Sequence, residues 1–171
     1  MVFILIGMPG CGKSCMGRAV YKKLGLKHLD ADKVIEKKTG RKLSDIIFND
    51  GVEAFKKIEE ETLLSLQLED VILSTGGSAI YYPEAMERFK SMGTVVYLYC
   101  SYDVIAERLG DFSKRGVVLR EGQTLKDLYD ERCPLYEKYA DVTVDCSGTN
   151  YSKYRERVFS VMKSIMEYSE G

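Results

Sequence analysis

The chain of 171 residues has little of what marks zinc proteins, membrane proteins or nucleic-acid-binding proteins. Its single histidine, His28, has no second histidine with which to build a zinc site, and it stands outside any Ser/His pattern. No apolar run approaches the roughly 20 residues that span a bilayer. The formal net charge of −1 argues against broad electrostatic capture of nucleic acid. We therefore expect neither membrane nor nucleic acid as a partner, and a structural role for His28.

The five cysteines also lack the spacing of a metal site or a disulfide framework, since no C-x-x-C pair occurs. This usage predicts reduced thiols in a cytoplasmic protein. Cys11 and Cys15 lie next to Lys13 and a predicted helix N-terminus, an environment that can lower a thiol pKa. We interpret both as small packing residues.

One stretch organises the rest of the sequence. Residues 7–14 read Gly-Met-Pro-Gly-Cys-Gly-Lys-Ser and match G-x-x-x-x-G-K-[ST], the phosphate-binding P-loop. An apolar run at residues 2–6 predicts a buried strand before it, and residues 16–24 predict a helix that ends at Gly25. The motif therefore has the strand and helix on either side that phosphate binding needs.

The chemistry of the loop follows from its residue types. Glycines allow the backbone N–H groups to turn around an anion, and the helix N-terminus adds partial positive charge. Lys13 can then reach the outer phosphates, and the Ser14 hydroxyl can ligate Mg²⁺. We expect Lys13 to face solvent when no nucleotide is bound. The competing interpretation, a glycine-rich turn with a chance Lys-Ser, requires strand, loop and helix to agree by accident.

The remaining pattern alternates strands with helices. Further strands are predicted at residues 27–29, 71–73, 94–99 and 142–144, and helices at 33–39, 44–48, 52–68, 83–92, 102–109, 125–139 and from about 151 to 168. The helix at 125–139 contains Pro134, which predicts a break or kink. We expect an α/β protein with a three-layer P-loop fold, in which a five-stranded parallel sheet is flanked by helices. The prediction is a single domain over residues 1–171, with a mobile lid at about 111–123.

The turns after the second and third strands carry candidate residues for a site. In a parallel sheet these turns converge with the P-loop at the strands' carboxyl ends. Asp30 ends a strand and can hold Mg²⁺, and Asp32 lies two residues on and can face an acceptor hydroxyl. An N-cap role is the alternative for these aspartates, and one residue can serve both purposes.

Other candidates carry positive charge or glycine. Lys56 can bind an acidic group on an acceptor or be a solvated surface charge, and the sequence favours neither. The turn at residues 76–78 can present N–H groups to a ligand or simply connect strand and helix. Four basic residues surround the predicted lid, where an arginine over the γ-phosphate would stabilise transition-state charge: Arg108, Lys114, Arg115 and Arg120.

Taken together these residues resemble the shikimate kinase family, over nearly the whole chain. The matching stretches are residues 7–14, 29–32, 39–41 with 44–46, 51–59, 74–78, and 132–136 leading into 140–144. The resemblance implies an ATP-dependent phosphotransferase with an alcohol acceptor, with shikimate and ATP giving shikimate 3-phosphate and ADP. It also implies Mg²⁺ as cofactor and, as partners, ATP and a small carboxylate-bearing acceptor. We expect the protein to be a monomer.

The resemblance assigns roles position by position. Catalytic roles fall to Lys13, Asp32 and Arg115, and Mg²⁺ binding to Ser14 and Asp30. ATP would be bound by Gly10, Cys11, Gly12, Lys13, Ser14, Cys15, Arg108 and Arg115, with Arg108 against the adenine and Arg115 as the lid arginine. The acceptor would be bound by Asp32, Lys56, Gly76, Gly77, Ser78 and Arg132, with Arg132 on its carboxylate.

Departures from the family pattern gather on the acceptor side. Lys56 stands where arginine is usual, Val52 where glutamate is, and Ser78 where a third glycine is, while the lid reads Arg-Gly-Val-Val at residues 115–118. A lysine offers a point charge where arginine offers a planar fork. One alternative is therefore a related kinase acting on another hydroxy acid or polyol, such as homoserine or a sugar acid. Another is a nucleotide-binding regulatory protein, against which the set Lys13, Ser14, Asp30 and Asp32 argues.

Overall fold

The computed structural model of the protein describes residues 1–110, 117 and 119–169. Its sheet has five parallel strands in the order β2-β3-β1-β4-β5. The strands are β1 (Val2–Ile6), β2 (Lys27–Asp30), β3 (Val71–Ser74), β4 (Thr94–Tyr99) and β5 (Val142–Asp145). All five strands predicted from the sequence are confirmed. Because β1 lies in the middle with a strand on each side, its apolar run is buried along its whole length.

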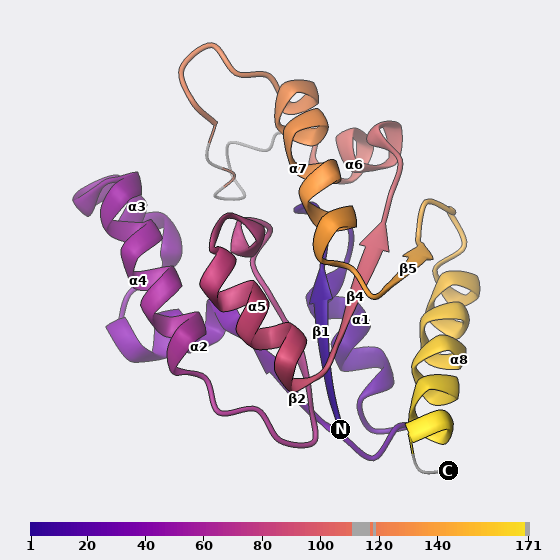
Figure 1. The fold of residues 1–171 in the computed structure, drawn as a ribbon. Helices are drawn as coiled ribbons and strands as arrows, with labels where there is room; N and C mark the ends of the chain where they lie inside the picture. Colours follow the sequence, from indigo (N-terminus) through magenta and orange to yellow (C-terminus); the bar gives the residue numbers. More distant parts are fainter. Residues whose placement is uncertain (111–116, 118, 170–171) are drawn as a thin grey trace.

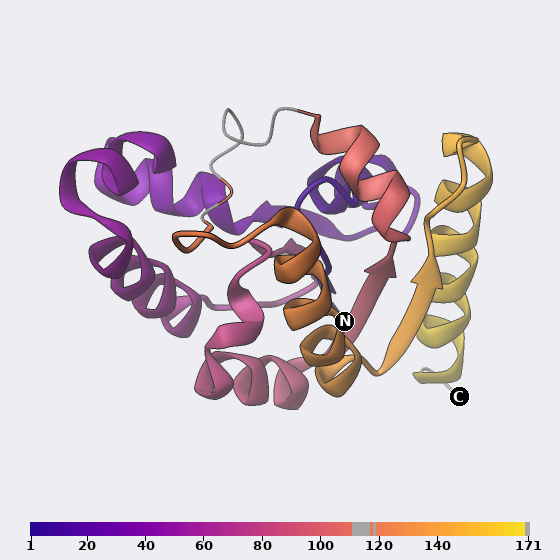
Figure 2. The same ribbon diagram turned by 90° about the horizontal axis from the view of Figure 1, so that it is seen from above.

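Helices cover both faces of the sheet, as Figures 1 and 2 show. They are α1 (Lys13–Val20), α2 (Ala31–Thr39), α3 (Leu43–Asp50), α4 (Val52–Ser65), α5 (Pro83–Met92), α6 (Tyr102–Leu109), α7 (Leu125–Tyr139) and α8 (Tyr151–Ser169), with a short 3₁₀ helix η1 (Ala79–Tyr81). Helices α1 and α8 pack together on one face, and α5 and α7 pack on the other. The predicted three-layer α/β fold is therefore confirmed.

Helices α2, α3 and α4 pack on one another at the β2 side of the sheet (Figure 1). They have a small core of their own, made by Ile35, Ile46 and Phe55. This arrangement places the inner face of α4 beside the carboxyl ends of β2 and β3. Glu59 on α4 consequently lies against the turn that follows β3, where its carboxylate accepts from the Ser78 hydroxyl.

Helices α1 and α7 differ from the sequence prediction, and α4 ends at Ser65 rather than at residue 68. Helix α1 begins at Lys13 rather than Met16, because the last residues of the P-loop form its first turn, and it ends at Val20. Helix α7 continues through Pro134 without a break. Pro134 and Asp130, whose carbonyl loses its helical partner, both lie on the exposed face of α7, where water can bind that carbonyl.

Candidate active site

The P-loop leaves β1 at the carboxyl edge of the sheet and enters α1. Gly12 caps the helix with a φ of 95°, in the left-handed region that residues with a side chain rarely adopt. The hydroxyl of Ser74, at the end of β3, donates to the carbonyl of Lys13 across 3.0 Å. His28 Nε2 lies 3.0 Å from the same Ser74 hydroxyl, which ties β2 to the base of the loop. His28 thus has the structural environment expected for it.

Lys13 does not face solvent, and that expectation is wrong. Its side chain is only 8% exposed, and its ammonium group donates to the carbonyls of Gly7 at 2.7 Å and Met8 at 3.1 Å. The loop's own carbonyls thus serve as partners for the charge. A phosphate that enters the loop would exchange these neutral partners for a charged one, which binds a cation more strongly.

Ser14 and Asp30 are brought into direct contact, with the Ser14 hydroxyl donating to Asp30 Oδ2. The other oxygen of Asp30 caps α2, accepting from the N–H groups of Asp32 at 3.1 Å and Lys33 at 3.4 Å. Both readings of Asp30, as cap and as candidate metal ligand, are therefore compatible. The two oxygen donors fit Mg²⁺, which binds few protein oxygens and completes its shell with phosphate and water. In the described part of the chain, no group of three or more Asp, Glu, His or Cys side chains is arranged to hold a metal ion by itself.

Asp32 lies at the start of α2 and shares its surroundings with two other acids. Burial, then the charges of Asp30 and Glu59, raise the pKa of Asp32 to about 6, although Lys13 opposes the shift. A carboxyl group with this pKa is ionised at neutral pH and still basic enough to accept a proton from a reacting hydroxyl. The environment therefore suits the role of base that was predicted for it.

Glu59 is a second acid at this site and was not among the predicted site residues. It is 2% exposed, and it accepts hydrogen bonds from the hydroxyls of Ser78 and Tyr82. Burial raises the pKa of Glu59, while these two hydroxyls and the charge of Arg132 lower it. One signal was available in the sequence: Glu59 lies four residues after Phe55, so the two share the inner face of α4.

The turn at Gly76 and Gly77 separates acidic from basic side chains. A Cβ atom on Gly76 would lie 2.7 Å from Glu59 Oε1 and 3.2 Å from Asp32 Oδ1. A Cβ atom on Gly77 would lie 3.0 Å from Arg132 Nη1 and 2.8 Å from Pro9 Cδ. Only glycine leaves these charged groups accessible across the turn.

Arg132 is the basic group of this arrangement. Its side chain is 6% exposed, and among the described residues it forms no ion pair with a carboxylate. The ring of Tyr81 lies under its guanidinium group, 5.2 Å away. A buried cation normally has an anionic partner, so Arg132 is suited to bind an anionic group of a ligand.

Lys56 is the predicted acceptor residue that the structure does not bring to the others. Its ammonium group is exposed and pairs with Glu53 on the same helix, at 3.0 Å. Such an exposed pair is weak, so a ligand can displace it. Ser78 is brought to the site, but its hydroxyl is directed at Glu59.

On the nucleotide side, the guanidinium group of Arg108 is held firmly in place. It donates to Cys100 Sγ at 3.3 Å and to the carbonyl of Cys146 at 3.0 Å, and the ring of Tyr154 lies 5.3 Å from it. This leaves a flat, fixed surface of the kind on which an aromatic base can stack.

The two loop cysteines differ in their surroundings. Cys11 is fully buried, as a packing residue should be, whereas Cys15 is exposed with its sulfur 3.3 Å from the hydroxyl of Tyr151. The packing interpretation therefore holds for Cys11 and is wrong for Cys15, because the first turn of α1 turns Cys15 outward. All five cysteines are free thiols.

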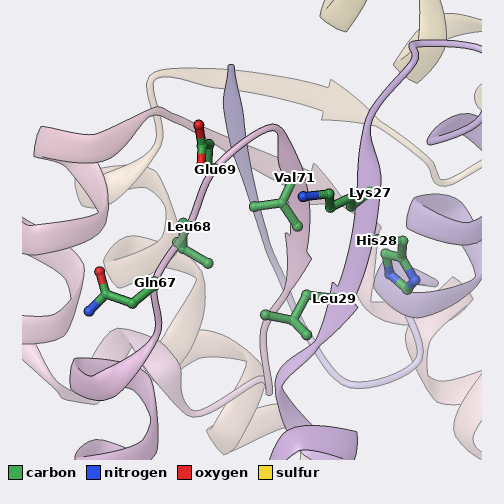
Figure 3. Close-up of a pocket in the computed structure, with 7 residues that line it drawn as sticks. All are labelled: Lys27, His28, Leu29, Gln67, Leu68, Glu69 and Val71. Atoms are coloured by element: carbon green, nitrogen blue, oxygen red, sulfur yellow. The ribbon is translucent and has the colours of Figure 1, made fainter.

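Arg115 and most of the predicted lid fall outside the described residues. A depression of about 600 Å³ lies between β2 and the segment that leads into β3 (Figure 3), and it is lined by Lys27, His28, Leu29, Gln67, Leu68, Glu69 and Val71. None of the candidate site residues lines it. No helix among the described residues has the length and apolar character to cross a bilayer.

A P-loop on a five-stranded parallel sheet, with acids and an arginine across a glycine turn, defines a P-loop phosphotransferase. The comparisons with known proteins specify the family. The model of the shikimate kinase family matches residues 9–165. This chain belongs to the shikimate kinase family, whose members are phosphotransferases that act on a hydroxyl acceptor.

Individual relatives agree with this assignment along almost the full chain. Shikimate kinase from Bacillus cytotoxicus is 35% identical over 161 residues, which cover 94% of this chain and 97% of that protein. Shikimate kinase from Thermodesulfovibrio yellowstonii is 37% identical over 91% of each chain. The structure of shikimate kinase from Acinetobacter baumannii in complex with shikimate superposes with a TM-score of 0.84 and 32% identity, over 98% of this chain and 93% of that one. That of Aquifex aeolicus shikimate kinase gives 0.81 and 31%, over 96% and 98%.

Proposed function

We propose that this protein transfers the γ-phosphoryl group of ATP to the 3-hydroxyl of shikimate. The observation that carries the proposal is the glycine turn, with Asp32 and Glu59 on one side of it and Arg132 on the other. Shikimate has a carboxylate at one end of its ring and hydroxyls at the other, so its charges and hydrogen-bond donors fit these two sides. The family membership and the related structure in complex with shikimate support the same acceptor.

In the proposed reaction, Arg132 binds the acceptor carboxylate and so fixes the ring relative to the P-loop. Asp32 accepts the proton of the reacting hydroxyl as its oxygen bonds to the γ-phosphorus. The bond from that phosphorus to the bridging oxygen breaks, and ADP leaves. Lys13 moves from the carbonyls of Gly7 and Met8 to the phosphates, where it stabilises the developing charge.

Ser14 and Asp30 would hold Mg²⁺, which neutralises phosphate charge when it is bound with the nucleotide. The backbone N–H groups of Gly10, Cys11, Gly12 and Cys15 would bind the phosphates, and Arg108 would stack on the adenine. Arg115 would supply a lid cation. We further propose a monomer that acts in the cytoplasm, where its five free thiols would stay reduced.

The departures on the acceptor side leave one competing acceptor class open. Ser78 gives little reason to prefer that other acceptor class, because the Ser78 hydroxyl already has a partner in Glu59. Lys56 is the stronger reason, since it offers a point charge in place of an arginine fork. A screen of hydroxy acids and polyols by coupled ADP release tests the proposal. ATP turnover that requires shikimate supports it, and turnover that requires only another acceptor would reject it.

A further inference from the structure

Tyr81 lies between the buried Arg132 and the surface of the protein. It ends η1, four residues after Gly77 in the same turn, and is 38% exposed. Its ring lies 5.2 Å from the Arg132 guanidinium, and its hydroxyl accepts from Arg132 Nε at 3.4 Å. One tyrosine therefore contacts both the face and the Nε edge of the candidate carboxylate-binding arginine.

The hydrogen of the Tyr81 hydroxyl is directed to a different partner. It is donated to Glu131 Oε2 at 2.8 Å, so the oxygen lone pairs remain available to Arg132. Glu131 in turn pairs with Arg120 and accepts from Gln123 Nε2 at 3.3 Å. The hydrogen bond from Tyr81, followed by Arg120, lowers the pKa of Glu131, which keeps it ionised. A continuous chain of polar contacts thus runs from Arg132 through Tyr81 and Glu131 to residues 120 and 123.

This chain restricts the orientation of Arg132. A free arginine side chain has several rotatable bonds, and a bidentate contact with a carboxylate requires its planar fork to be aimed correctly. The contact with Tyr81 occupies one face and the Nε edge, which leaves the terminal nitrogens for a ligand. Arg132 Nη1 is the atom that lies 3.0 Å from a Cβ position on Gly77, so the open end of the fork points toward the glycine turn.

We propose that Tyr81 is a positioning residue that orients Arg132 for the carboxylate of the acceptor, with Glu131 as its anchor. The inference rests on the proposed function only in requiring an acceptor that carries a carboxylate. It assigns to Tyr81 a contribution to acceptor specificity, exerted through Arg132. Tyr81 itself need not touch the acceptor.

The test compares an acid with its uncharged ester. Tyr81→Phe keeps the ring and removes the hydroxyl, so the fold and the guanidinium–ring contact should persist. We expect the KM for shikimate to rise about threefold to tenfold, the effect of one hydrogen bond, with kcat and the KM for ATP nearly unchanged. The preference for shikimate over its methyl ester should fall by the same factor. This ratio is insensitive to a general loss of folded protein.

Two further variants make the test specific. Tyr129→Phe is the matched control. Tyr129 lies on α7, and its hydroxyl donates a hydrogen bond to the carbonyl of Cys100 at 2.7 Å. The variant should leave the acid-to-ester preference as in the wild type. Glu131→Gln should reduce the preference, and adding Tyr81→Phe to it should reduce it little further, because the two residues act as a unit.

The outcome separates this inference from the proposed function. If shikimate is not turned over, the proposed function fails, and the same acid-to-ester comparison is made with the carboxylate acceptor that the ADP-release screen identifies. A lower preference in Tyr81→Phe then still supports the positioning role. An unchanged preference in Tyr81→Phe, with whichever acceptor the enzyme uses, would overturn the inference and leave the kinase reaction standing.

Discussion

The Ser78 hydroxyl lies 2.9 and 2.8 Å from the two carboxylate oxygens of Glu59, a residue on α4, 19 positions earlier. The Tyr82 hydroxyl contacts the same carboxylate at 2.7 Å. Two hydroxyls thus stabilise a buried acid, and among the described residues this acid forms no ion pair with a basic side chain. Ser78, which departs from the family's triple glycine, thereby links the glycine turn to α4.

Removing the Ser78 hydroxyl should therefore destabilise the protein. Ser78→Ala leaves Glu59 with one hydroxyl partner, and we expect the free energy of unfolding to fall by about 1–3 kcal/mol, because a buried carboxyl group loses a hydrogen bond. Urea denaturation measures this. Ser91→Ala is the control, since its hydroxyl is exposed and bonds only to the carbonyl of Arg88 on its own helix. Equal stability of Ser78→Ala and the wild type would contradict the role given to Ser78.

Lys13→Ala should abolish most of the phosphoryl transfer and also lower stability. Loss of a positive charge at the developing phosphate reduces kcat by about 100-fold or more. Because Lys13 is buried against the carbonyls of Gly7 and Met8, we expect an additional loss of about 1–3 kcal/mol in the free energy of unfolding. Steady-state kinetics and urea denaturation measure the two effects. Near-normal turnover would exclude the P-loop assignment.

Gly77→Ala should impair acceptor binding. The added methyl group would lie 2.8 Å from Pro9 Cδ and 3.0 Å from Arg132 Nη1, so the loop or the arginine must shift. We expect the acceptor KM to rise by about tenfold or more, given the usual cost of overpacking. Gly148→Ala is a matched control, because its nearest neighbour would be 4.0 Å away. If both variants bind the acceptor like the wild type, the acceptor does not lie at this turn.

Lys56→Arg distinguishes the two acceptor classes. If the acceptor is shikimate, the arginine fork can bind its carboxylate together with Arg132. We then expect kcat/KM to be preserved or to rise, by about a hundredfold at most. If the pocket serves another acceptor, the larger side chain should reduce activity on that acceptor. Lys57→Arg, at the neighbouring exposed position, is the control. A loss of shikimate turnover in Lys56→Arg alone would argue against the shikimate pocket.

The fold could be predicted because its signals are local. The apolar run Val2–Ile6 before a glycine-rich loop specifies a central strand and a P-loop, and the later strands repeat the same alternation with helices. The course of α7 could not be predicted in the same way. Whether Pro134 breaks a helix depends on whether water can reach the carbonyl of Asp130, which is a property of the folded surface.

The site was predicted less completely, because its groups interact across elements that are far apart in the sequence. Asp30 and Ser14 follow from the spacing of strand and loop. The burial of Lys13 does not, since it depends on carbonyls of its own loop that only the folded backbone turns inward. The contacts of Tyr81 with Arg132 and of Ser78 with Glu59 link residues 51 and 19 positions apart, and neither has a spacing signal.

The measurement that tests the central claim most directly is kcat/KM for shikimate, with ADP release followed in the presence of ATP and Mg²⁺. We predict that ADP is released only when shikimate is present, with kcat/KM near 10⁴ M⁻¹s⁻¹ or above, roughly the lower range of working enzymes. We also predict that Lys13→Ala loses this activity. No turnover of shikimate, together with strong turnover of a different hydroxy acid, would contradict the proposed acceptor.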